Sequence, residues 1–367
     1  MTENDEYRID GHKLIYHPER VTHWLKARGD WEKAKTIYPI YLEISPTGAC
    51  NHRCAFCALD YMEYRPRRLD LAVMKNALPE MALRGVRSIM FAGEGEPLLY
   101  HEIIPLAEAA RDAGLDIAFT TNGVLLKKDI AEQLLPLASW IKVSIDAGTA
   151  ETYAKLHGTA KGDFDLVIDN LRSAVRCREK NAISCTLGAQ MLVLPENVDE
   201  IGRLIGLCRD MIGLDYLVLK PYSHHHLSRI RRYKDLDYTP LTQKITSSLR
   251  GFDGSFKVIY RKNTFQSHIR GVQRYRSCGS VPFFWAYLTA GHDLYACSAF
   301  LGDQRFFLGN LLEQDFREIW EGKRREALFR MMREGFDISH CRLNCRMNLV
   351  NEYLWELENP HPHANFI

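Results

Sequence analysis

The sequence lacks several features that would place it in common classes of protein. No run of apolar residues approaches membrane-spanning length, and the polar N-terminus MTENDEYRIDGHK is unlike a signal peptide. A net charge of +2 argues against a general surface for nucleic acid or other polyanions. Low-complexity segments and short internal repeats are absent as well. We therefore expect a cytoplasmic protein that binds neither membrane nor nucleic acid.

The sequence contains a regular alternation of β-prone and amphipathic helical segments. It begins near residue 38 and continues through six βα-like units. This alternation predicts an α/β fold with a parallel sheet, in which ligands lie at the C-terminal ends of the strands. The predicted divisions are an N-terminal extension (1–37), the βα array (38–225), a connecting segment (226–270) and a second, smaller domain (271–367).

Ten cysteines are present, and in a reducing compartment clustered cysteines indicate a metal or redox site. Cys50, Cys54 and Cys57 directly follow the first predicted strand. A structural zinc ion needs a fourth ligand, for which the adjacent His52 is poorly placed. A redox dithiol would leave Cys50 unexplained. A [4Fe–4S] cluster with three thiolates remains, and it leaves one iron open to a further ligand.

The C-x3-C-x-aromatic-C pattern, with Phe56 as the aromatic residue, resembles the signature of the radical S-adenosylmethionine (radical SAM) enzymes. The resemblance implies a partial (β/α)6 TIM-like barrel. It also implies that S-adenosylmethionine chelates the open iron and is cleaved reductively to a 5'-deoxyadenosyl radical. That radical would take a hydrogen atom from a substrate, and an external donor such as flavodoxin or ferredoxin would supply the electron.

Motifs after later strands resemble the motifs with which this family contacts its cofactor. Gly95, Glu96 and Pro97 match a Gly-Gly-Glu-Pro motif, with Glu94 in place of its first glycine. His157 stands where some relatives carry an arginine that pairs with the cofactor's carboxylate. The resemblance implies a cofactor site formed by Phe56, Glu94, Gly95, Glu96, Thr121, Asn122, Ser144, His157, Gln190 and Leu192.

Four further cysteines lie in the C-terminal region. Cys278 and Cys297 bracket two β-prone segments, which predicts a hairpin with its turn at 290–291. Cys341 and Cys345 follow a predicted helix around 313–334. The region resembles the SPASM domain in its shorter, twitch form. This resemblance implies a small α+β domain with one auxiliary [4Fe–4S] cluster, and zinc is the alternative for these four thiolates.

Charged and polar residues near the strand ends are candidates for contacts with a substrate. Glu43 and Lys142 stand inside predicted strands, where a barrel interior would give them partners. Lys220, Tyr222 and His224 follow the sixth strand and suit an anionic or polyhydroxylated substrate. A solvated basic loop is the competing interpretation of this last segment.

The resemblance implies an oxidoreductase or related radical enzyme, and it leaves the product open. Peptide maturases often carry a recognition unit before the barrel, and only some 37 residues stand there. We therefore expect oxidation or epimerisation of a small polar molecule such as a sugar, aminocyclitol or nucleotide-sugar. Maturation of a ribosomally made peptide, through a thioether or carbon–carbon crosslink, is the alternative. A non-catalytic iron–sulfur protein is a third interpretation.

Overall fold

The computed structural model describes residues 5–27, 29–250, 252, 256–342 and 345–366. Its centre is one ten-stranded sheet in the order β10-β9-β8-β1-β2-β3-β4-β5-β6-β7. Neighbours from β1 to β7 are all parallel. The strands are β1 (Tyr41–Ile44), β2 (Ser88–Phe91), β3 (Asp116–Thr121), β4 (Ala138–Ser144), β5 (Thr186–Val193), β6 (Tyr216–Pro221), β7 (Lys257–Tyr260), β8 (Trp285–Leu288), β9 (Asp293–Tyr295) and β10 (Phe307–Asn310).

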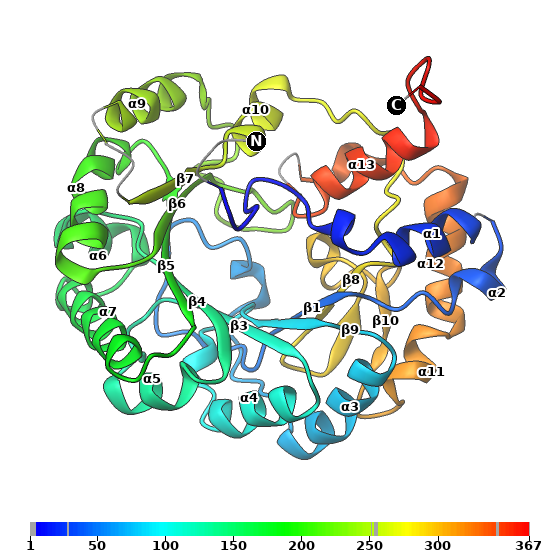
Figure 1. The fold of residues 1–367 in the computed structure, drawn as a ribbon, viewed down its shortest axis with the longest axis horizontal. Coiled ribbons are helices and arrows are strands. Elements are labelled where there is room, and N and C mark those ends of the chain that lie inside the picture. The colour runs from blue at the N-terminus through cyan, green and yellow to red at the C-terminus, as the bar shows by residue number, and fades with distance from the viewer. Residues whose placement is uncertain (1–4, 28, 251, 253–255, 343–344, 367) are drawn as a thin grey trace.

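The sheet curves around an interior, and helices cover its outer face, as expected for an α/β partial barrel (Figure 1). Helices α3 to α8 lie between successive strands from β1 to β6, with both α6 and α7 between β4 and β5, and α11 and α12 follow β10. The helices are α1 (Pro18–Lys26), α2 (Trp31–Ala34), α3 (Leu71–Leu83), α4 (Ile103–Asp112), α5 (Lys128–Leu134), α6 (Ala150–His157), α7 (Gly162–Lys180), α8 (Ile201–Gly206), α9 (Thr239–Leu249), α10 (Lys262–Arg270), α11 (Phe316–Trp320), α12 (Lys323–Glu334) and α13 (Asn348–Glu358). None of them, within the described ranges, has the length and apolarity needed to cross a bilayer.

Strand alternation decides which side chains enter the barrel. Leu42, Ile44 and Ile141 point outward into the main hydrophobic core beneath the helices. Glu43 lies between Leu42 and Ile44, and Lys142 lies between Ile141 and the core residue Val143, so both face the interior. The same reasoning places the following side chains inside the barrel: Ser144, Gln190, Leu192 and Lys220.

The N-terminal extension packs along the last strands of the barrel. Tyr7 lies against Tyr216, with ring centroids 5.4 Å apart, and Ile9 joins the same apolar group. Tyr216 is the first residue of β6, whereas Asp10 accepts from the Asn263 amide at 2.7 Å, beyond the C-terminal end of β7. The C-terminal ends of the strands, where parallel-stranded folds bind their ligands, carry the cysteine loop.

Two features extend the barrel beyond the six predicted units. Strand β7 and helix α10 lie within 226–270, which the sequence presents as a connection. The predicted hairpin at 290–291 is present as β8 and β9, and β8 pairs in parallel with β1. The C-terminal strands therefore continue the barrel sheet, and the predicted helix around 313–334 is two helices, α11 and α12.

Candidate active site

The loop with Cys50, Cys54 and Cys57 follows β1 and docks on the C-terminal end of α6. The Arg53 amide donates to the His157 carbonyl at 3.1 Å, and the Ala55 amide donates to the Leu156 carbonyl at 2.8 Å. Gly158 ends the helix with a φ of 59°, and a Cβ there would stand 2.2 Å from the Arg53 carbonyl oxygen. Glycine at this position therefore permits the close approach of loop and helix.

The three thiols of this loop form one half-buried group. Burial raises the pKa of Cys50 to about 11, and it raises the pKa values of Cys54 and Cys57 as well. The charges of Cys50 and Cys57 add to the upward pKa shift of Cys54, which places all three within electrostatic reach of one another. Three thiolates held together here need a cation, and this donor set fits iron with one open coordination position.

Glu96 ties the cysteine loop to the ends of β2 and β3. Its amide donates to the Ala49 carbonyl at 2.8 Å, and its carboxylate accepts from the Asn122 amide at 2.7 Å and from the Thr121 hydroxyl. The Asn122 side chain in turn donates to the Asn51 side chain at 2.7 Å. Burial raises the pKa of Glu96. Four predicted cofactor residues, Gly95, Glu96, Thr121 and Asn122, thus lie beside the cysteines.

Ser144, the last residue of β4, is the register partner of Gln190 inside β5. Neither side chain forms a hydrogen bond with another residue in the described part of the chain, so both have free polar groups. Leu192 packs in an apolar group that contains Cys54 and Phe56. Ser144, Gln190, Leu192 and Phe56, all predicted to contact the cofactor, thus give this region both polar and apolar surface.

Glu94 and His157 have partners other than the expected cofactor. The Glu94 carboxylate accepts from the Ala290 amide at 3.0 Å and from Arg67 at 3.2 Å, so it links β2 to the β8–β9 turn. The His157 ring lies between Asp146, 3.2 Å from Nε2, and the Cys54 sulfur, 3.7 Å from Nδ1. Position in the sequence identifies both residues as near the site without specifying their partners.

The four C-terminal cysteines line a single cavity. Burial raises the pKa of Cys341 to about 12 and that of Cys345 to about 11, and it raises the pKa of Cys297 well above its ordinary value. Asn351 of α13 donates to the Cys278 sulfur at 3.4 Å. Four thiols in one enclosure fit a fully ligated cluster. The remaining lining is mostly apolar and includes Trp285, Phe300, Phe306, Met332 and Phe336.

Comparison with known families assigns both regions. The Radical SAM superfamily matches residues 44–208, and SPASM, an iron–sulfur cluster-binding domain, matches residues 278–346. The chain is a radical SAM protein with a C-terminal SPASM domain. Its cofactors are those of the two domains: S-adenosylmethionine with a [4Fe–4S] cluster, and auxiliary iron–sulfur. The second match begins at Cys278 and ends one residue after Cys345.

Several relatives and solved structures resemble this radical SAM protein. GTP 3',8-cyclase of Chlorobaculum tepidum is 29% identical over 53% of this chain and 57% of its own. The GTP 3',8-cyclase of Rhizobium etli is 32% identical over 55% of this chain and 57% of its own length. The chain thus spans under two thirds of these relatives. Streptococcus suis SuiB bound to S-adenosylmethionine shares the fold, with a TM-score of 0.65, 19% identity, and coverage of 96% of this chain and 81% of that one.

The interior of this radical SAM barrel is strongly basic. Arg346, next to a cluster cysteine, enters it and pairs with Glu43 at 2.7 Å. Lys142 lies 5.4 Å from the Trp140 ring centroid and forms no ion pair with a described residue. Lys220 is likewise without an ion pair in the described ranges. Burial and the nearby Arg261 lower its pKa to about 8, and burial and Lys220 lower the pKa of Lys142.

Arg261 and Arg346 are site residues that sequence reasoning missed. Arg261 follows β7, a strand that the sequence presented as a connection. Arg346 directly follows Cys345, and this proximity to a cluster ligand was the available signal.

The loop after β6 bridges the barrel and the SPASM region. The Tyr222 hydroxyl lies 3.3 Å from His224 Nδ1 at the barrel rim. His225 is fully buried, 3.1 Å from the Tyr61 hydroxyl and 3.3 Å from the Ser298 carbonyl oxygen. The segment is thus anchored through His225, whereas its basic residues Arg229, Arg231 and Arg232 are exposed, as the interpretation as a solvated basic loop predicts.

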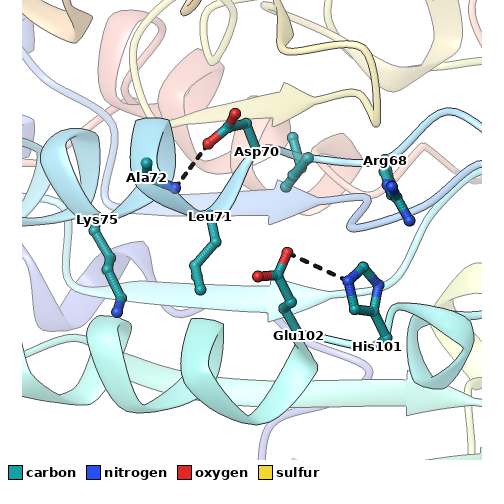
Figure 2. Close-up of a pocket in the computed structure, with 8 residues that line it drawn as sticks. Arg68, Asp70, Leu71, Ala72, Lys75, His101 and Glu102 are labelled. Carbon is teal, nitrogen blue, oxygen red and sulfur yellow. Dashed lines mark hydrogen bonds and ion pairs between the residues drawn. The ribbon is translucent and has the colours of Figure 1, made fainter.

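A separate surface pocket lies between the N-terminal ends of α3 and α4 (Figure 2). Asp70 caps α3 by accepting from the Ala72 amide at 2.8 Å, and His101 lies 3.7 Å from the Glu102 carboxylate. These groups satisfy one another, and the described lining contains no cysteine. We assign the pocket no part in the radical chemistry.

Proposed function

We propose that this protein cleaves S-adenosylmethionine reductively and abstracts a hydrogen atom from a small, polar, anionic substrate, which it oxidises or epimerises. Sugars, aminocyclitols and nucleotide-sugars that carry phosphate or carboxylate are the candidates. When bound, the cluster and S-adenosylmethionine supply the 5'-deoxyadenosyl radical. An external one-electron donor such as flavodoxin or ferredoxin supplies the electron.

The residues divide this task according to their position. Cys50, Cys54 and Cys57 hold the cluster, and Glu96 keeps their loop against the sheet through its contact with Ala49. The free side chains of Ser144 and Gln190 and the apolar group that contains Leu192 form the adjacent wall for the cofactor. A wall of this kind orients a ligand that has both polar and apolar parts.

The unpaired lysines of the interior carry the proposal of an anionic substrate. Burying an ammonium group is costly unless an anion accompanies it. Lys142 and Lys220 share the interior with two arginines that already have carboxylate partners: Arg261 lies 3.7 Å from Asp10, and Arg346 lies 2.7 Å from Glu43. A phosphate or carboxylate of the substrate would supply the missing negative charge. The GTP 3',8-cyclases carry in their name a substrate that is itself a polyanion.

Peptide maturation is the second candidate, with less support. It rests on the likeness to SuiB, one structure of which contains its precursor peptide SuiA, with 20% identity and a TM-score of 0.63. Similarity at this level supports the fold alone, and a neutral peptide segment would leave the interior lysines without a counter-ion.

The test is to incubate the anaerobically reconstituted protein with S-adenosylmethionine, a reductant and a panel of phosphorylated or carboxylated sugars. We expect one compound to stimulate 5'-deoxyadenosine formation and to lose two hydrogens or change configuration. Lys142→Met should lower that stimulation at least tenfold, about 1.4 kcal/mol, because the anion loses a partly buried cationic partner. Lys128→Met, at an exposed lysine of α5, is the control.

Two results would contradict the proposal. One is stimulation by neutral sugars equal to that by their phosphates. The other is turnover seen only with a precursor peptide, which would favour the maturase alternative.

A further inference from the structure

His157 is held in one orientation directly behind a cluster cysteine. The Tyr153 ring stacks on it with centroids 4.1 Å apart and an interplanar angle of 22°. The Phe56 ring meets it edge-on at 5.6 Å, and the His52 ring does so at 5.4 Å. The side chain is only 1% exposed. A ring clamped on three sides in this way presents fixed nitrogen positions to its neighbours.

Asp146 determines which nitrogen of His157 carries a proton. The Asp146 amide lies 3.3 Å from His157 Nε2 and is a donor, so in a neutral ring Nε2 accepts and Nδ1 carries the hydrogen. The Asp146 carboxylate oxygen that lies 3.2 Å from Nε2 makes no hydrogen bond with it, so the amide is the hydrogen-bond partner of Nε2. With Nε2 accepting from this amide, Nδ1 is the N–H donor. It points at the Cys54 sulfur, 3.7 Å away.

We propose that His157, oriented by Asp146, donates an N–H···S hydrogen bond to the Cys54 thiolate and thereby raises the reduction potential of the radical SAM cluster. Reduction adds negative charge to the cluster and its sulfurs, and a hydrogen bond to sulfur stabilises the more negative state. His157 is thus a positioning residue that acts on the cluster through Cys54.

Phe56, the aromatic residue of the cysteine motif, helps to hold His157 in this position. Phe56 meets the His157 ring edge-on from the cysteine loop itself, while the Arg53 and Ala55 amides bind that loop to the end of α6. The donor and the acceptor of the N–H···S bond are therefore held by the same small unit of structure.

The direct test is a redox titration of the reconstituted full-length protein. The change that S-adenosylmethionine causes in the EPR signal identifies the cluster with the open iron. His157→Leu should lower its midpoint potential, and a tenfold less favourable reduction corresponds to 59 mV for one electron. His157→Gln keeps a side-chain N–H donor and should recover most of the shift. Tyr153→Phe, which keeps the stacked ring, is the matched control.

A second measurement detects the contact between His157 and the cluster directly. Pulsed EPR of the reduced wild-type protein, grown with 15N-histidine, should detect a nitrogen coupled to the cluster, and His157→Leu should abolish it. An uncoupled nitrogen, or equal potentials in wild type and His157→Leu, would overturn the proposal. So would a changed affinity for S-adenosylmethionine at an unchanged potential, which would assign His157 to the cofactor instead. Because His52, Cys54 and His157 offer ligand atoms within 4.8 Å of one another, a stoichiometric zinc ion bound there would also overturn it.

Discussion

The two cysteine sets of this radical SAM protein differ in how they are assembled and in what surrounds them. The first lies within one short loop, and local hydrogen bonds to α6 and to the β2 and β3 ends hold it. The second draws its ligands from residues 278–345, and the β8–β9 hairpin, α12 and α13 bring them together.

Their surroundings explain what each set can do. The three-cysteine loop borders free polar side chains and a charged interior, so a polar ligand can reach its open coordination position. The four-cysteine cavity has largely apolar walls, and its four thiols would fill every ligand position of one cluster. An open site suits cleavage of a bound cofactor, whereas a closed, apolar site suits electron transfer or structural support.

The largest expected effect comes from removing a ligand of the open set. Cys57→Ala should reduce 5'-deoxyadenosine formation to background, because two thiolates do not hold a cluster that binds S-adenosylmethionine. Iron should fall from about eight to about four atoms per chain. Anaerobic reconstitution with iron analysis and product chromatography measures both quantities, and Cys208→Ala, at a buried core cysteine, is the control. Persistent cleavage would remove this loop from the chemistry.

The matched change in the closed set should separate the two sites. Cys345→Ala should also bring iron to about four atoms per chain, while cleavage of S-adenosylmethionine without substrate continues within a few-fold of wild type. Conversion of the substrate should fall strongly, since Arg346 next to this ligand pairs with Glu43 in the interior. Wild-type iron near four, or zinc in the second site, would contradict a second [4Fe–4S] cluster.

The sequence alone predicts those parts of the site that are local in the chain. Cysteine spacing and the motifs at strand ends indicated both ligand sets, the barrel and the residues beside Glu96. The sequence alone does not predict contacts between segments that are distant in the chain. Arg346 meets Glu43 across some 300 residues, and β8 joins β1 by parallel pairing over a similar span. Such register depends on the whole fold, because an isolated segment contains no information about its neighbour.

Short elements in polar surroundings also escaped prediction. Strand β7 is four residues long and lies in a polar stretch, so its periodicity is too brief to recognise. The orientation of His157 depends on α6 returning its C-terminal end to the cysteine loop, a tertiary contact. Only the presence of a histidine near the site was visible in the sequence.

The smallest expected effect is a pH dependence confined to the open site. Burial, with nearby arginines, lowers the pKa of Lys220 to about 8, so it loses its proton as the pH rises past that value. Binding of an anionic substrate should weaken about tenfold per pH unit above 8, and Lys220→Met should bind the substrate weakly at every pH.

The free energy of unfolding should change with pH in the direction opposite to substrate binding. Between pH 8 and the ordinary lysine pKa, the unfolded chain binds more protons than the folded one, so the free energy of unfolding should rise with pH by about 3 kcal/mol from this group. Lys220→Met should remove that rise, whereas substitutions in the apolar SPASM cavity, such as Met332→Leu, should leave it intact. A wild-type free energy of unfolding that does not change with pH over this range would show that Lys220 is solvated or already paired with an anion. The three-cysteine site would then differ less from the closed four-cysteine site in the charge that surrounds it.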